Sequence, residues 1–103
     1  MIFGRLNNKF NREHTISNEL GLVIETKGSI DGSGIVYVVF FKSLITKLPK
    51  SHRDFIDQTK DGLWYIHETW FEQVIPFPEE ERKIIDAWNE YREVLMLRKV
   101  VCL

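Results

Sequence analysis

Cysteine and long apolar segments are scarce in this chain of 103 residues. Its single cysteine, Cys102, cannot form an internal disulfide, which removes the usual stabilising element of small secreted domains. The longest apolar run, Ile35 to Phe41, is far shorter than the roughly 20 residues of a membrane-spanning helix. The first six residues lack the apolar core of a signal peptide. We therefore expect a cytoplasmic domain that has no membrane partner.

An excess of charge of one sign is also absent. Fourteen Lys and Arg residues against fifteen Asp and Glu residues give a formal net charge of −1. No overall basic field therefore attracts the molecule to nucleic acid or to an anionic membrane. The chain is 44% hydrophobic and 28% charged, which is typical of a globular domain with a modest core and excludes a wholly disordered chain.

Sequence patterns for catalysis and metal binding are missing as well. His14, His52 and His67 are too far apart for a local metal motif, and no His-Glu-x-x-His or Cys-x-x-Cys occurs. An acid–base pair of His67 and Glu68 is less favoured than a local hydrogen bond at a strand end. Segment 28–34 lacks the Gly-Lys-Ser/Thr ending of a phosphate-binding loop and indicates a hairpin. We expect no enzyme activity, no metal and no cofactor.

The middle of the chain has the pattern of short β-strands. The β-branched segment 22–26 leads into a turn-rich loop at 27–34, and the run 35–41 is the strongest strand signal. Because both faces of that run are apolar, it predicts a central strand with a helix or the N-terminal arm on its second face. Segments 63–66 and 73–75 predict two further strands. Short strands joined by glycine-rich turns predict a small antiparallel barrel.

Residues 78–96 have the pattern of an amphipathic helix. Pro78 followed by three glutamates is typical of a helix start. The apolar stripe consists of Ile84, Trp88, Tyr91 and Leu95. Beyond Leu95 the apolar residues fall on the face that was polar one turn earlier, so residues 97–103 are predicted to be a separate apolar tail. This tail either adds a strand to the barrel edge or is buried against a second molecule.

The other segments complete one domain of residues 1–103. Residues 1–20 carry scattered apolar side chains, which predicts a short helix or an irregular arm on the body of the protein. The predicted barrel covers residues 21–76 and contains a long polar insert over 44–62, with one helical turn near 52–59.

Several of these segments together form a familiar arrangement. They are Ile16 to Glu25, with a glycine opening the first strand, the apolar run 35–41, and the tryptophan-containing segments Trp64 to His67 and Trp70 to Ile75. This arrangement, over residues 15–76, resembles the small SH3-like barrels common among tailed-phage proteins. The resemblance implies an α+β fold, a small antiparallel SH3-like β-barrel with a C-terminal α-helix, and a phage-type origin. It implies no catalytic residues, because function lies in sites rather than in folds.

Exposed aromatic or apolar side chains are the candidates for a function. SH3-like barrels use such side chains both in the core and as a peptide-binding surface. The candidate partner-binding residues are Trp64, Tyr65, Trp70, Leu97 and Val101. We therefore expect a non-enzymatic, phage-type interaction module. Its protein partner is either a host factor, which it inhibits or redirects, or a second copy of the chain in a homo-oligomer.

The uneven distribution of charge keeps two alternatives open. Residues 42–60 contain five basic and two acidic residues, a balance of +3, whereas residues 61–95 contain nine acidic and three basic residues, a balance of −6. A nucleic-acid-binding barrel would contact phosphates through the basic residues of the insert. Those residues are Lys42, Lys47, Lys50, Arg53 and Lys60. The second alternative is a virion structural component whose arm and tail lock into neighbouring subunits.

Overall fold

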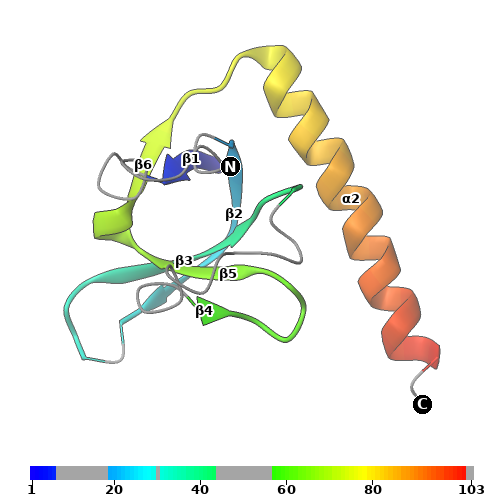
Figure 1. Ribbon diagram of the computed structural model, residues 1–103, viewed down its shortest axis with the longest axis horizontal. Helices are drawn as coiled ribbons and strands as arrows, with labels where there is room; N and C mark the ends of the chain where they lie inside the picture. Colours follow the sequence, from blue (N-terminus) through cyan, green and yellow to red (C-terminus); the bar gives the residue numbers. More distant parts are fainter. Residues whose placement is uncertain (7–18, 30, 44–56, 102–103) are drawn as a thin grey trace.

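The protein has an α+β fold, a curled antiparallel sheet with one long C-terminal helix, α2 (Pro78–Val101), beside it (Figure 1). This computed structural model describes residues 1–6, 19–29, 31–43 and 57–101, and of residues 57–58 and 98–101 the backbone alone. The predicted fold class, an antiparallel sheet followed by a C-terminal helix, is confirmed at this level.

The described residues form a sheet of six strands in the order β4-β5-β3-β2-β1-β6. The strands are β1 (Ile2–Leu6), β2 (Gly21–Gly28), β3 (Ile35–Phe40), β4 (Asp57–Gln58), β5 (Trp64–His67) and β6 (Phe71–Val74). All neighbouring strands pair antiparallel. A single 3-10 turn, η3 (Glu68–Trp70), leads from β5 into β6, which returns to pair with β1. The sheet therefore curls into a half-barrel (Figure 1).

Strand β3 lies at the centre of the sheet, between β2 and β5, as its sequence predicts. Its side chains alternate between two apolar clusters on opposite faces of the sheet. The inner cluster, on the face turned away from α2, consists of Leu6, Tyr37, Val39, Phe41, Trp64, Ile66 and Phe71. The outer cluster, beneath α2, consists of Phe3, Leu20, Leu22, Val38, Phe40, Leu63 and Ile84. A helix or the N-terminal arm was predicted on the second face of the central strand, and helix α2 lies there.

The prediction of an N-terminal helix or irregular arm is wrong for residues 2–6. These residues form β1, which pairs with both β2 and β6. Phe3 enters the outer cluster and Leu6 the inner one, so both faces of β1 are buried and the sequence shows no polar–apolar alternation. Gly4 is required in this strand, because a Cβ there would collide with the ring of Phe71 and the main-chain carbonyl of Glu72. The rest of the predicted arm, residues 7–18, lies outside the described residues.

The predicted helical turn near 52–59 is wrong at its described end, where residues 57–58 form the short strand β4 against β5. Residues 52–56 lie outside the described part of the chain. The loop predicted at 27–34 is a hairpin between β2 and β3, with Gly32 and Gly34 at φ values of 74° and 143° that favour glycine. The predicted hairpin is therefore confirmed.

Helix α2 begins at Pro78, as predicted, but continues to residue 101 instead of ending near residue 96. The prediction that residues 97–103 leave the helix, as an edge strand for example, is wrong as far as residue 101. Residues 92–99 lack glycine and proline and include leucine, methionine, arginine and lysine, which all favour helix whether or not their side chains are buried. The helix therefore continues after its sheet-facing stripe has ended.

Candidate functional site

The C-terminal end of α2 extends past the sheet on which the rest of the helix packs. The helix residues that contact the outer cluster are Ile84, Ile85, Ala87, Trp88 and Tyr91. Tyr91 is the last of them, and its hydroxyl donates a hydrogen bond to the main-chain carbonyl of Asp61 in the turn before β5. Beyond Tyr91 the helix leads away from the sheet (Figure 1). We call residues 92–101 the helix extension.

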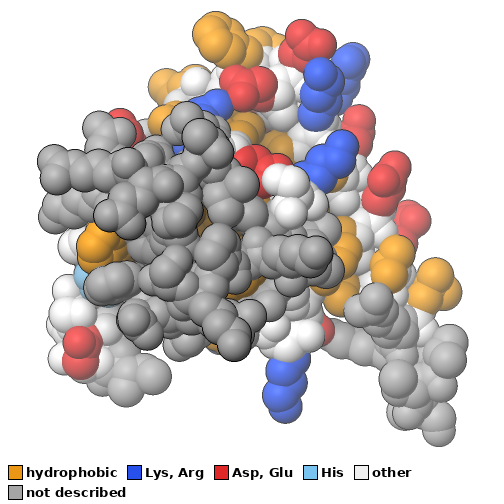
Figure 2. Space-filling model, viewed as in Figure 1, with side chains coloured by type: hydrophobic (Ala, Val, Ile, Leu, Met, Phe, Trp, Pro, Cys, Tyr) orange, Lys and Arg blue, Asp and Glu red, His pale blue; other side chains and the backbone are white. Residues whose placement is uncertain are grey.

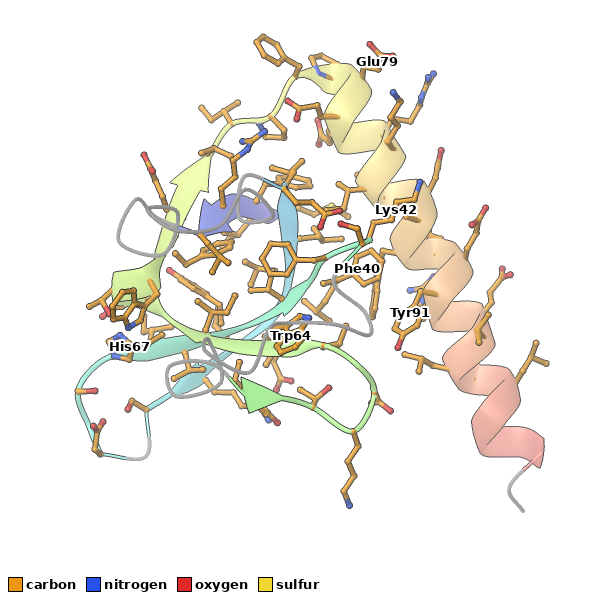
Figure 3. The ribbon with its side chains drawn as sticks, in the orientation of Figure 1. Phe40, Lys42, Trp64, His67, Glu79 and Tyr91 are labelled. Carbon is orange, nitrogen blue, oxygen red and sulfur yellow. The ribbon has the colours of Figure 1, made fainter. Side chains whose placement is uncertain are left out.

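Aromatic packing fixes the direction in which α2 crosses the sheet. The ring of Phe40, on β3, lies 5.3 Å from the ring of Trp88 and 5.5 Å from that of Tyr91, measured between centroids. Figure 3 shows Phe40 and Tyr91 beside one another between the sheet and α2. At the other end of the helix, Arg5 Nη2 on β1 lies 2.8 Å from Glu80 Oε2. The first half of α2 is thus held to β1 and β3, and the direction of the helix extension follows from it.

Apolar side chains of the helix extension are exposed. Val94, Met96 and Leu97 have exposed fractions of 43%, 62% and 64%. Val94 and Leu97 are three residues apart and therefore adjacent on the helix surface. In Figure 2 exposed apolar side chains lie on the distal part of α2, below the acidic residues of its outer face. Apolar groups gathered at one exposed place are typical of an interaction surface.

A second exposed apolar group lies in the connection between β6 and α2. Ile75 and Phe77 have exposed fractions of 98% and 76%. Pro76 and Pro78 alternate with them, and each proline favours an extended conformation in the residue before it. These side chains belong to a short connection, and the helix extension presents the longer regular surface.

His67 joins the β2–β3 hairpin to η3. Its Nδ1 accepts a hydrogen bond from the main-chain N–H of Thr69, over 3.2 Å, and its Nε2 lies 3.2 Å from Ser33 Oγ. Hydrogen bonds from Ser29 and Ser33 hold the pKa of Asp31 in this hairpin below its usual range. The interpretation of His67 as a local hydrogen-bonding residue is confirmed, since the ring caps η3.

The aromatic residues predicted to bind a partner do not share one surface. Trp64 is 2% exposed and belongs to the inner cluster, so its prediction as a surface residue is wrong. Trp70 is partly buried against the same cluster. Tyr65 points to the opposite face, where it packs against the outer cluster with Lys27 Nζ 5.6 Å from its ring centroid. Strand alternation explains this separation of neighbouring aromatic residues.

Leu97 is the most exposed of the predicted partner-binding residues whose side chains are described. Val101 lies on the same helix extension, and its backbone alone is described. The sequence-based prediction missed Val94 and Met96. A signal for Val94 was present, because positions 94, 97 and 101 are apolar at the i, i+3, i+7 spacing of one helix face.

The basic residues predicted to contact nucleic acid are described only in part. Lys42 and Lys60 are exposed. Lys47, Lys50 and Arg53 lie outside the described residues, so the basic surface as a whole stays a prediction.

Comparison of the chain with models of protein families, with curated proteins and with solved structures finds no match. In the described ranges no three His, Cys, Asp or Glu side chains are placed to share a metal ion. No helix in the same ranges has the length and apolar character needed to cross a membrane. The helix extension remains the candidate functional site on its own geometry.

Proposed function

We propose that this protein is a non-enzymatic interaction module of the phage type, and that its helix extension binds a protein partner. The observation that carries the proposal is the exposure of Leu97 and its neighbours on a helix that has already left the sheet. The helix extension is continuous with the packed half of α2, and its exposed apolar side chains are in contact with water. A partner that covers the apolar side chains would stabilise the segment and remove those side chains from water.

The spacing of the exposed residues favours one way of binding. Positions 94, 97 and 101 follow the i, i+3, i+7 pattern by which a helix places apolar side chains in a groove or against another helix. Burying a Val, Leu or Met side chain contributes about 1.5–3 kcal/mol. Association itself costs about 4–15 kcal/mol. A few such side chains therefore support a weak complex, and the partner must add polar contacts for a tight one.

The SH3-like assignment belongs to the same proposal. It is supported by the strand order β5-β3-β2-β1-β6, in which consecutive strands wrap until the last one pairs with the first. The 3-10 turn η3 makes this return within three residues. Such curling, with the last strand returned to the first, is a common arrangement in small antiparallel sheets. The function then lies outside the barrel interior, which the inner cluster fills.

The partner is a host factor that the protein inhibits or redirects, or a second copy of the chain. The alternative of a nucleic-acid-binding barrel rests on five basic residues, of which Lys42 and Lys60 are described, and that of a virion component rests on an arm of which residues 7–18 lie outside the described ranges. No described contact favours either over a protein partner.

Affinity capture from a bacterial lysate tests the proposal. The bait variants are the wild type, Leu97→Asp, and Asn89→Asp as a control that adds the same charge at an exposed position of the same helix. We expect polypeptides that are retained by the wild type and by Asn89→Asp and lost with Leu97→Asp. Retention of the same polypeptides by all three baits would contradict binding through the helix extension. Circular dichroism of the three baits checks that each one folds.

A further inference from the structure

The helix extension contains one complete heptad with the composition of a dimeric coiled coil. With Val94 assigned to position a, Leu97 occupies position d and Val101 the next a. A β-branched residue at a with leucine at d favours two parallel strands. Val94 and Leu97 are exposed, as residues at positions a and d are in a coiled-coil helix without a partner. We call positions 94, 97 and 101 the seam. The sequence thus supplies the apolar residues through which one helix contacts another in a coiled coil.

This seam does not compete with the packing of α2 on the sheet. At 100° per residue, positions 94, 97 and 101 are centred about 120° around the helix from the predicted apolar stripe of Ile84, Trp88, Tyr91 and Leu95. A second helix can therefore lie along the extension while the barrel stays on the other side.

The charges that flank the seam make it complementary to itself. Glu93 occupies position g of the preceding heptad, and Arg98 occupies position e of the heptad that begins at Val94. In a parallel pair, the residue at g of one helix faces the residue at e of the other, five positions further along. Two copies would therefore form two Glu93–Arg98 pairs, related by the two-fold axis. An antiparallel pair places g beside g and loses this match, so the charges favour the parallel arrangement.

We infer that the partner of the helix extension is a second copy of this chain, bound through a short parallel coiled coil over residues 93–101. The inference rests on the proposed function, because it names the partner of the same surface. Glu90 occupies the preceding d position, where two like charges would meet, so the seam starts after it. One heptad buries little area, and we expect a weak dimer with a dissociation constant on the order of 100 μM.

Sedimentation equilibrium over a range of protein concentrations tests the inference. We expect the wild type to pass from monomer to dimer as its concentration rises. Leu97→Asp should weaken the dimer at least about tenfold, because it places two carboxylates in the seam. Met96→Asp, which adds the same charge at the exposed position c, should leave the dimer unchanged. A wild type that stays monomeric to about 1 mM overturns the inference, and so does a dimer that Leu97→Asp leaves intact.

Charge reversal tests the flanking pairs separately from the apolar seam. Glu93→Arg and Arg98→Glu should each weaken the homodimer, roughly threefold to tenfold, because two attractive pairs become repulsive. Mixing the two variants should restore dimers, since both cross-pairs are then opposite in charge. Equal dimer formation by either variant alone and by the mixture would contradict the pairing of Glu93 with Arg98.

Cysteine crosslinking tests the parallel direction. In a Cys102→Ser background, Leu97→Cys should form a disulfide-linked dimer under mild oxidation, because residues at d face each other across a parallel pair. Met96→Cys, one residue away, is the control and should crosslink more slowly. If the two variants crosslink at the same rate, the parallel coiled coil is wrong.

The failure of this inference is distinguishable from that of the proposed function. A wild type that is monomeric in pure solution but captures a foreign protein through Leu97 overturns self-association and keeps the interaction module. A chain that forms no dimer and captures nothing in a Leu97-dependent way overturns both.

Discussion

The two halves of α2 share one continuous backbone and differ in what surrounds them. In residues 78–91, Ile84 is buried and the ring of Trp88 packs against Phe40. In residues 92–101, Val94 and Leu97 are exposed. The same helical geometry therefore serves two purposes. The first half completes the outer cluster of the domain, and the second half presents a surface beyond it.

This difference shows that the length of a helix and the length of its packed part have separate causes. Helix continuation requires only residues that tolerate the helical backbone, and residues 92–99 supply them. Packing requires an apolar face directed at the sheet, and the described contacts with the outer cluster end at Tyr91. The exposed half is thus available for a partner without any change in the fold.

The largest difference between the two halves is expected when one apolar side chain in each half is truncated to alanine. Ile84→Ala should lower the free energy of unfolding by about 2–5 kcal/mol, because it leaves a cavity in the outer cluster. Leu97→Ala should change it by less than about 0.5 kcal/mol, since the side chain is exposed in the monomer. Urea unfolding at a protein concentration of a few micromolar measures both. Similar losses for the two variants would show that the extension is packed within its own chain.

The hydroxyl of Tyr91 marks the boundary between the two halves. Tyr91→Phe keeps the ring against Phe40 and removes the hydrogen bond to the carbonyl of Asp61. We expect a loss of about 0.5–1.5 kcal/mol in the free energy of unfolding. Hydrogen exchange of the amides after residue 91 should also become faster, because the helix loses its hydrogen bond to the turn before β5. Unchanged stability and exchange would place the boundary elsewhere on the helix.

An element is predictable from the sequence when the pattern of its own residues shows how it is buried. It is not predictable when its burial depends on distant parts of the chain. Strand β3 was predictable because its apolar residues occupy both faces, and the start of α2 because Pro78 precedes three glutamates. Strand β1 was not predictable, because Phe3 and Leu6 enter different clusters, and these clusters form only when distant strands pack together.

The candidate site was predictable only in part for a related reason. Strand alternation correctly separates Trp64 from Tyr65, but the sequence of β5 does not show which face is inward. Trp64 was therefore wrongly predicted to be a surface residue. The prediction of a separate tail from residue 97 is wrong as far as residue 101, because it required a single amphipathic stripe. A second stripe on another face is compatible with helix when its partner lies outside the domain.

A smaller effect should come from the ion pair that holds the first half of α2 to β1. Arg5 Nη2 and Glu80 Oε2 lie 2.8 Å apart, with side-chain exposed fractions of 29% and 40%. Glu80→Gln keeps the shape of the side chain and removes its charge. After allowance for solvent screening, we expect a loss of about 0.2–1 kcal/mol in the free energy of unfolding. Thermal unfolding at low and at high salt measures it, and a larger loss would indicate that this pair, besides apolar burial, fixes the helix.

The smallest effect is expected one residue earlier, at the matched position Glu79. Its Oε1 lies 3.5 Å from Lys83 Nζ, within the helix, and the two side chains are 74% and 69% exposed. Glu79→Gln should therefore lower the free energy of unfolding by no more than about 0.2–0.5 kcal/mol, and added salt should abolish the difference. Glu79 and Glu80 occupy the same helix turn, and the ion pair with Arg5 on β1 is formed by Glu80. A loss for Glu79→Gln as large as that for Glu80→Gln would mean that charge near the helix start, rather than contact with β1, stabilises the packed half.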